Sequence, residues 1–463
     1  MKKLKTKHIY LLFCLATLFL FLINNHFLPG FACLVFLYLF HELIFSDHIY
    51  YDQNKEYSWT FDGCIKETAV VNDNVLSIPK KWQDGYNILC KVRIKKSPSS
   101  FFFDPYVKLK TDSEIDTQVQ YFERGCNTYR YINITHSLEP GTIEAEIKII
   151  GHYCQLDFSD SELIISPKID IDNKKIMCIA PHPDDAEIAA FGLYSTTDCF
   201  LVTVTAGEAE PETFRKYDSD SSSAALLKGR VRAWDSIAIP LWAGISRDQC
   251  IQLGYYCKQL KKMFENPDQS VHSPYADIND SRVFREFNPF TLKSDKNGKT
   301  SWNQLVSDLN ELIHLVKPDI IVTPHPTLDS HDDHKYTTKA IKQALKASGI
   351  KNVDFFYYAN HLESTDLYPF GPPHTLISVP PVIDNHLKIS GFQSIQLSAR
   401  NQKNKLISLE MNHDLNRPVK LKKWLRKKIQ QLFIRRYIPD YGHDEFFRKS
   451  VKNNEFFITS KFN

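Results

Sequence analysis

Hydrophobic and polar positions follow two different patterns along this chain of 463 residues, and the change occurs near residue 170. From about Tyr50 to Ser166, short alternating and aromatic runs are separated by Gly, Pro, Asn and Asp. Alternation with a period of two is typical of antiparallel strands that bury one face. We therefore expect a β-sandwich-like accessory domain over residues 49–166.

After the polar stretch 166–175, apolar runs without a polar face alternate with helical stretches. The runs read IMCIAP, CFLVTVT, DIIVTP and VDFFYYA, and helical patterns surround residues 224–239, 302–316 and 336–347. Strands that are apolar on both faces are typical of a mostly parallel sheet with helices on both sides. This pattern predicts a Rossmann-like α/β domain over residues 173–415, with its site at the carboxyl ends of the strands.

The N-terminal segment is the most apolar part of the chain. Residues 9–45 are apolar apart from a break around residues 24–30, and four lysines precede them. Each half is near the lower limit of the roughly 17–25 residues that a membrane span needs. The pattern favours a helical hairpin that anchors residues 1–48 in the inner or plasma membrane and leaves the later domains in the cytoplasm. A single span, which would place them outside, stays open, and His41 and Glu42 count against the hairpin because both are costly in lipid.

The cysteines bear on the same question. Four of them fall in the accessory domain, namely Cys64, Cys90, Cys126 and Cys154. An even set could form two disulfides in an oxidising compartment, which argues against a cytoplasmic location. The hairpin topology instead predicts four free thiols.

Residues 416–463 are expected to form a basic amphipathic helix and a C-terminal tail. The stretch 417–436 has nine basic and no acidic side chains, and its apolar residues recur at helical spacing. Such a helix can lie on an anionic membrane, so membrane lipid is an expected partner of this helix and of the N-terminal segment. Docking on the catalytic domain is the alternative. The formal net charge of +3 gives no reason to expect a nucleic-acid partner.

Polar side chains that can bind metal follow two of the predicted strands. His182, Asp184 and Asp185 come directly after IMCIA, and His331 and His334 follow DIIVTP. Taken singly, such residues often cap helices or close turns. Together they offer two His and one Asp to a divalent ion, the arrangement that leaves a fourth zinc position open for water. Neither set contains cysteine, which argues against a purely structural zinc.

These motifs resemble the PIG-L/LmbE family of zinc-dependent N-acetylglucosaminyl de-N-acetylases. PHPDDAEIAAFG is similar to the first motif of the family, and SHDDHKYTTKAI is similar to the second. VTVTAGE at 202–208 and the Arg232–Asp235 stretch extend the resemblance over residues 174–348. Asp235 replaces the usual Glu, and the C-terminal pattern of the family is blurred, so no role is carried onto Lys405 or His413.

The resemblance implies a role for each residue of the motifs. It implies one Zn²⁺ per chain, bound by His182, Asp185 and His334. Asp184 would be the general base, and His331 the electrophilic or acid partner that stabilises the oxyanion. Asp333 would hold His331 in its protonated state, and Arg232 would grip the polar part of the substrate.

The function implied is hydrolysis of the N-acetyl group of an N-acetylglucosamine-type conjugate. The conjugate could be a glycolipid, a surface polysaccharide or a precursor, and the products are acetate and a free amine. Two alternatives stay open. One is a non-catalytic, membrane-anchored carbohydrate-binding protein whose β-rich domain binds sugar. The other is a different metal-dependent hydrolase.

Overall fold

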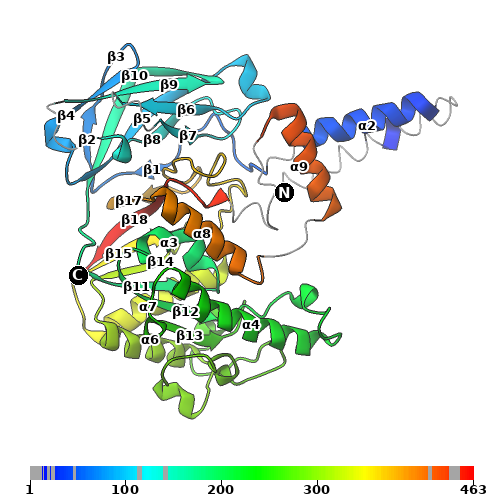
Figure 1. Cartoon of the computed structure of the whole chain (residues 1–463), viewed down its shortest axis with the longest axis vertical. Helices are drawn as coiled ribbons and strands as arrows, with labels where there is room; N and C mark the ends of the chain where they lie inside the picture. The colour runs from blue at the N-terminus through cyan, green and yellow to red at the C-terminus, as the bar shows by residue number, and fades with distance from the viewer. Residues whose placement is uncertain are drawn as a thin grey trace.

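The described part of the protein consists of a β-rich domain and an α/β domain, with helices α2 (Phe27–Ile44) and α9 (Leu421–Ile434) at one side (Figure 1). The structure, a computed structural model, describes residues 13, 15–17, 21, 27–44, 48–111, 117–138, 144–415, 420–436 and 449–463. The described residues include α2 (Phe27–Ile44) near the N-terminus and β18 (Asn454–Phe462) at the C-terminus. The expected order of a β-rich region followed by an α/β region is confirmed.

The β-rich domain consists of two antiparallel sheets. One has the strand order β2-β10-β5-β8 and the other β3-β4-β9-β6-β7. Alternate side chains of each strand are buried between them, as Val92 and Ile94 of β5 show. The strands are β2 (Ile65–Thr68), β3 (Val70–Asn72), β4 (Val75–Pro79), β5 (Tyr86–Lys96), β6 (Tyr106–Lys110), β7 (Gln118–Tyr121), β8 (Tyr129–Asn133), β9 (Glu144–His152) and β10 (Cys154–Pro167).

The α/β domain is built on a seven-stranded sheet of order β13-β12-β11-β14-β15-β18-β17. The first five of these strands run parallel to one another, and β18 is antiparallel to both of its neighbours. The apolar runs of the sequence form four of the strands. In chain order, the strands of this sheet that precede β18 are β11 (Lys175–Ala180), β12 (Asp198–Thr205), β13 (Cys250–Tyr255), β14 (Ile320–Pro324), β15 (Val353–Tyr358) and β17 (Gly391–Gln396).

Helices cover both faces of this sheet, which is why its central strands lack a polar face. Met177 and Ile179 of β11 pack in one core with α6 and α7, and Ile176 and Cys178 pack in another with α3. The helices are α3 (Asp185–Tyr194), α4 (Ser221–Trp242), α5 (Leu260–Glu265), α6 (Trp302–Val316), α7 (Asp332–Ser348) and α8 (Ala399–Met411).

The sheet takes in a strand from beyond residue 415, where the sequence pattern placed the end of the domain. β18 pairs with β15 at one edge and with β17 at the other, and it lies beside α8 in Figure 1. The pairing of Tyr357 with Ile458 joins residues about a hundred positions apart. Periodicity reports only on neighbours along the chain, so it gave no sign of this pairing.

The two domains meet along a seam of buried amides. The Asn87 side chain donates to the carbonyl of Phe392 at 3.0 Å, and Asn133 donates to the carbonyl of Ile377 at 3.0 Å. A short parallel pair, β1 (Trp59–Thr60) with β16 (Leu387–Lys388), adds backbone contacts. Burial of hydrogen-bonded amides fixes the orientation of the domains, because separation would leave these groups unpaired.

No helix in the described part of the chain is long and apolar enough to cross a membrane. The expected location, a membrane-anchored protein with a cytoplasmic catalytic domain, is therefore wrong on this finding. Most of the first half of the expected hairpin lies outside the described residues. Mean hydropathy cannot tell a membrane span from a helix that packs on another helix.

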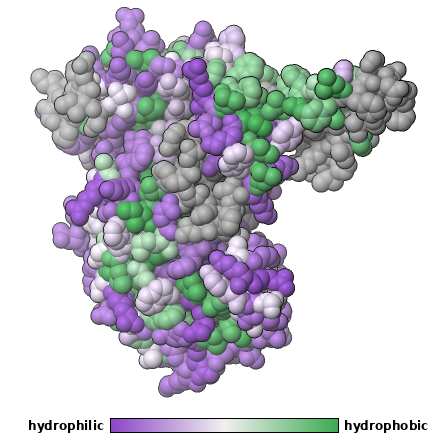
Figure 2. Space-filling model, turned by 45° about the vertical axis from the view of Figure 1, so that its right-hand side comes forward, coloured by the Kyte–Doolittle hydropathy of each residue, from purple (hydrophilic) through white to green (hydrophobic). Residues whose placement is uncertain are grey.

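In the structure α2 packs on α9 (Leu421–Ile434), the basic helix expected from the sequence. Glu42, which is 1% exposed, accepts from Arg426 at 2.5 Å, and the Gln430 side chain donates to the Glu42 carbonyl at 3.2 Å. Figure 2 shows hydrophobic residues gathered over this part of the surface. They include the exposed side chains of Phe31 and Phe36. Glu42, which counted against a membrane hairpin, thus lies in the contact between α2 and α9.

The four cysteines of the accessory domain are free thiols. Burial raises the pKa of Cys90 to about 12 and that of Cys64 to about 11. The alternative of two disulfides is not found.

Candidate active site

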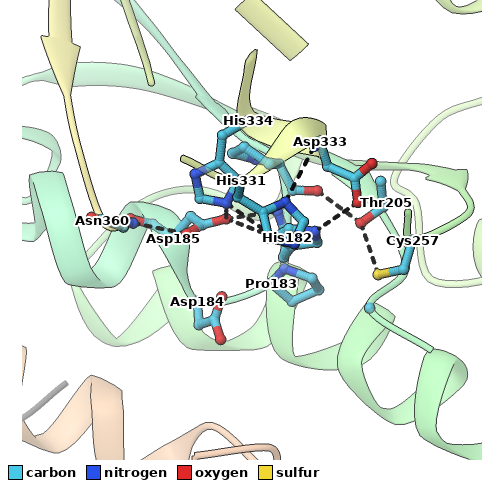
Figure 3. Close-up of polar contacts among 12 residues, drawn as sticks. His182, Pro183, Asp184, Asp185, Thr205, Cys257, His331, Asp333, His334 and Asn360 are labelled. Atoms are coloured by element: carbon cyan, nitrogen blue, oxygen red, sulfur yellow. Dashed lines mark hydrogen bonds and ion pairs between the residues drawn. The ribbon is translucent and has the colours of Figure 1, made fainter. Parts of the chain in front are cut away.

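The two polar motifs meet at the carboxyl edge of the sheet (Figure 3). β11 ends at Ala180, and α3 begins at Asp185. β14 ends at Pro324, and α7 begins at Asp332. Because β11 and β14 are parallel neighbours, the turns that follow them lie side by side. Sequence positions some 150 residues apart thus form one cluster.

His182, Asp185 and His334 form a triangle of donor atoms. His182 Nδ1, Asp185 Oδ2 and His334 Nε2 are each 3.2 Å from the other two. A tetrahedral zinc with bonds of about 2.0–2.2 Å separates its ligand atoms by about 3.3–3.6 Å. The triangle is slightly tighter than this, and a single ion above it would touch all three atoms. The residues therefore fit a metal with three protein ligands and an open position.

Further polar residues hold two of these side chains in place. Asp329 Oδ2 lies 2.9 Å from His334 Nδ1, and Asn360 donates to Asp185 Oδ1 at 2.8 Å. The Asn360 backbone N–H also donates to Asp329 at 3.0 Å. Such contacts fix the tautomer and orientation of metal-binding side chains. Sequence reasoning assigned no role to Asp329 or Asn360. For Asp329, the sequence offered one signal, a carboxylate five residues before His334. Asn360 follows β15, and no signal in the sequence marked it.

Asp333 contacts His182, which corrects the expectation that it holds His331. Its Oδ2 lies 3.1 Å from His182 Nε2 and accepts from the Lys258 backbone N–H at 2.6 Å. The reason is local geometry. Asp333 lies in the first turn of α7, and its backbone N–H, rather than its carboxylate, faces the His331 ring.

His331 is the N-cap residue of α7 and lies within the cluster. Its Nδ1 accepts from the Asp333 backbone N–H at 3.2 Å, and its ring lies 4.9 Å from that of His182. Burial, together with the nearby rings of His182 and His334, lowers the pKa of His331 to about 3. These surroundings favour the neutral ring, and the expected protonated His331 stays a prediction.

Asp184 lies beside the triangle without being part of it (Figure 3), and it is paired with Arg232. The guanidinium donates to Asp184 Oδ2 at 2.9 Å. Burial raises the pKa of Asp184 to about 7, although the Arg232 charge lowers it. The backbone of Asp184 has φ 136°, a conformation that L-residues rarely adopt and that concentrates at functional sites. A buried carboxyl that titrates near neutral pH suits a general base.

Arg232 is 5% exposed and is engaged on several sides. Besides Asp184, it reaches the Gly207 carbonyl at 3.2 Å and Asp414 Oδ2 at 3.3 Å. Asp414 also lies 3.1 Å from the Lys228 amine. In this arrangement Arg232 holds Asp184, and its expected role of gripping substrate remains a proposal.

The segment after α8 closes this side of the site. His413 Nδ1 lies 2.6 Å from Asp235 Oδ1, and the Asn412 side chain donates to the Pro183 carbonyl at 3.2 Å. Asp235 raises the pKa of His413 through this hydrogen bond. The sequence gave no role to His413, because the family-like pattern there is blurred. Its contact with Asp235, the residue that replaces the usual Glu, becomes visible only in the fold.

Comparisons with known proteins agree with the site. Residues 177–345 match the PIG-L family, described as GlcNAc-PI de-N-acetylase, so this part of the chain is a PIG-L domain. A comparison with curated proteins gives no match.

Three solved structures show weak similarity. A 4-carboxy-2-hydroxymuconate hydratase from Pseudomonas putida is 13% identical with a TM-score of 0.30, covering 57% of this chain and 83% of its own. A conserved protein from Thermus thermophilus is 15% identical with a TM-score of 0.26, and the match covers 56% of this chain and 87% of that protein. A family two carbohydrate esterase from Cellvibrio japonicus is 11% identical with a TM-score of 0.16, and the match covers 70% of this chain and 91% of the esterase. Likenesses this weak carry no argument about function.

Proposed function

We propose that the PIG-L domain removes the N-acetyl group from an N-acetylglucosamine-type conjugate, with one Zn²⁺ held by His182, Asp185 and His334. The observation that carries the proposal is the triangle of 3.2 Å between donor atoms of these three residues. Its two nitrogens and one oxygen are the ligand types of a hydrolytic zinc. The PIG-L match supplies the substrate class.

Each side chain of the site has a task in this reaction. Bound zinc supplies Lewis acidity, which polarises the amide carbonyl and makes water a better nucleophile near neutral pH. Asp184 takes the proton from the attacking water, since its pKa of about 7 allows it to accept a proton and to release it again. Asp184 then gives that proton to the departing amine, and His331 could do the same only in its protonated form. Neutral His331 can donate a hydrogen bond from Nε2–H to the developing oxyanion, because its Nδ1 accepts from the backbone N–H of Asp333.

The experiment measures metal content and acetate release together in the full-length chain. We expect about one zinc per chain and acetate release from an N-acetylglucosamine conjugate. Asp184→Asn should keep its zinc and lose turnover by at least about a hundredfold, because it removes a base and not a ligand. His334→Ala should lose both. Asp172→Asn, an exposed carboxylate in the linker, is the matched control.

Two results would contradict the proposal. Full zinc retention in the single alanine variants of all three ligands would exclude the ligand set. Zinc binding without acetate release, in a protein that hydrolyses another bond, would favour a different metal-dependent hydrolase.

A further inference from the structure

The turn that follows β15 brings a further histidine, His361, to the site. One nitrogen of its ring and one ligand atom each of Asp185 and His334 all lie within 4.8 Å of one another. The ring centroids of His361 and His334 are 5.0 Å apart, close to the 5.2 Å between those of His182 and His334. His361 therefore flanks the edge of the triangle that joins Asp185 to His334.

His331 has the corresponding place on another edge of the triangle. One nitrogen of its ring lies within 4.8 Å of ligand atoms of both His182 and His334. The ring centroids of His331 and His361 are 5.7 Å apart. An oxygen that accepts hydrogen bonds of about 2.9 Å from two nitrogens requires those nitrogens to lie within about 5.8 Å of each other. Two rings at this separation can both donate to one oxygen atom.

Backbone hydrogen bonds fix the turn that carries His361. Asp329 Oδ2 accepts from the backbone N–H of Asn360 at 3.0 Å and from that of His361 at 3.3 Å. The backbone N–H of Ser330 donates to the carbonyl of His361 at 2.8 Å. Because Asp329 also contacts His334, one carboxylate ties this turn to the metal site. The backbone of His361 is thus in place before any substrate binds.

The chemistry of His361 suits a hydrogen-bond donor better than a fourth metal ligand. Three protein ligands leave one zinc position open for the reaction, and a fourth would close it. An imidazole carries at least one N–H whether it is neutral or protonated, so it can donate in both forms. His361 is half-buried and also lines a cavity of about 680 Å³, so a bound molecule can reach this residue.

We propose that His361 is a further catalytic residue, which donates a hydrogen bond to the carbonyl oxygen of the acetyl group as that oxygen becomes negative. His331 donates to the same oxygen from another side, so two side chains form the oxyanion hole. Donors held in place for a developing charge stabilise the transition state more than the bound substrate. The inference rests on the proposed deacetylase function, since it adds a residue to the same reaction.

The test compares His361→Phe with the wild type in the full-length, zinc-loaded chain, because Phe keeps a ring and removes the N–H. The substrate is whichever of N-acetylglucosamine, di-N-acetylchitobiose and GlcNAc-phosphatidylinositol the wild type hydrolyses fastest. We expect kcat of acetate release to fall by about a hundredfold, as when one oxyanion donor is removed, while KM changes little. Zinc affinity, measured by competition with a chromophoric chelator, should equal that of the wild type.

Binding of a transition-state analogue separates hydrogen-bond donation from a structural effect. The probe is the methylphosphonamidate of glucosamine, whose tetrahedral phosphorus places an anionic oxygen where the oxyanion forms. N-acetylglucosamine is the ground-state counterpart. His361→Phe should bind the analogue about a hundredfold more weakly and N-acetylglucosamine as well as the wild type does.

Further variants control for the size of the new side chain and for the substitution itself. His361→Gln can donate from a similar position, so it should regain at least about tenfold of the lost kcat. His361→Ala removes the donor without added bulk and repeats the comparison should Phe not be accommodated. His386→Phe, the same change at an exposed histidine, should behave as the wild type does.

Three outcomes would overturn the inference and leave the proposed function standing. Wild-type kcat and analogue affinity in His361→Phe would show that the ring has no part in catalysis. A loss of zinc affinity would identify His361 as a fourth ligand. Equal losses of affinity for the analogue and for N-acetylglucosamine would assign it a structural role. A wild-type chain that binds no zinc or releases no acetate would contradict the proposed function, and the inference would fall with it.

Discussion

Asp329 and His334 are joined by a contact of 2.9 Å between Oδ2 and Nδ1, and both side chains are fully buried. The contact leaves Nε2 of His334 directed at His182 and Asp185. Asp329 therefore decides which nitrogen of His334 is available as a ligand.

We expect Asp329→Asn to weaken zinc binding by about 10–100-fold, because the ring loses the charged acceptor that orients it. Competition with a chromophoric chelator measures the affinity. Asp332→Asn, an exposed neighbour in the same turn, should bind zinc as the wild type does. Equal affinities in the two variants would show that Asp329 has no part in the metal site.

Arg232→Gln should lower kcat of acetate release by about a hundredfold and change KM much less. The reason is that Asp184 would lose the cation that holds it in place and lowers its pKa. Steady-state kinetics separate this role from substrate binding. A variant with a raised KM and a normal kcat would show that Arg232 grips the substrate, as the family resemblance implies.

Lys405→Met should lower the free energy of unfolding by about 3–5 kcal/mol, because it leaves a buried carboxylate without its cation. The Lys405 amine lies 2.8 Å from Glu455 Oε1 on β18. Glu455 also accepts from the backbone N–H groups of Gly192 and Leu193, just after the break in α3 at Ala190.

Urea denaturation of Lys405→Met, Glu455→Gln and the double variant measures the coupling. The double variant should lose less than the sum of the single losses, since it no longer buries an unpaired charge. Additive losses would mean that the two side chains do not act as a pair.

Acid should weaken the seam between the domains through His136. Its Nε2 lies 2.8 Å from Ser394 Oγ, and burial lowers its pKa to about 4. The unfolded chain binds a proton at about pH 6.5, so the contribution of neutral His136 is complete above that pH. It is lost as the pH falls toward 4, by about 1.4 kcal/mol per pH unit.

Urea midpoints at pH 7 and pH 5 check this effect. The difference between the two midpoints should shrink in His136→Asn and should be unchanged in His314→Asn, an exposed control on α6. An equal shift in all three proteins would assign the acid sensitivity to other groups.

The sequence by itself determined the strands that carry the site and the residues that meet there. Apolar runs identified β11, β12, β14 and β15, because burial on both faces leaves no polar position in a strand. The two motifs placed His182, Asp185 and His334 in turns that meet at one edge of the sheet, and the family resemblance implied that these three are the metal ligands. These are local properties, readable from neighbours along the chain.

Only the tertiary structure decided what those residues contact. It directed Asp333 to His182, paired Arg232 with Asp184, and brought Asn360 from after β15 to Asp185. It also placed β18 inside the catalytic sheet and packed α2 on α9. Each of these contacts joins segments far apart in the sequence through specific side-chain torsions, and neither periodicity nor composition records them.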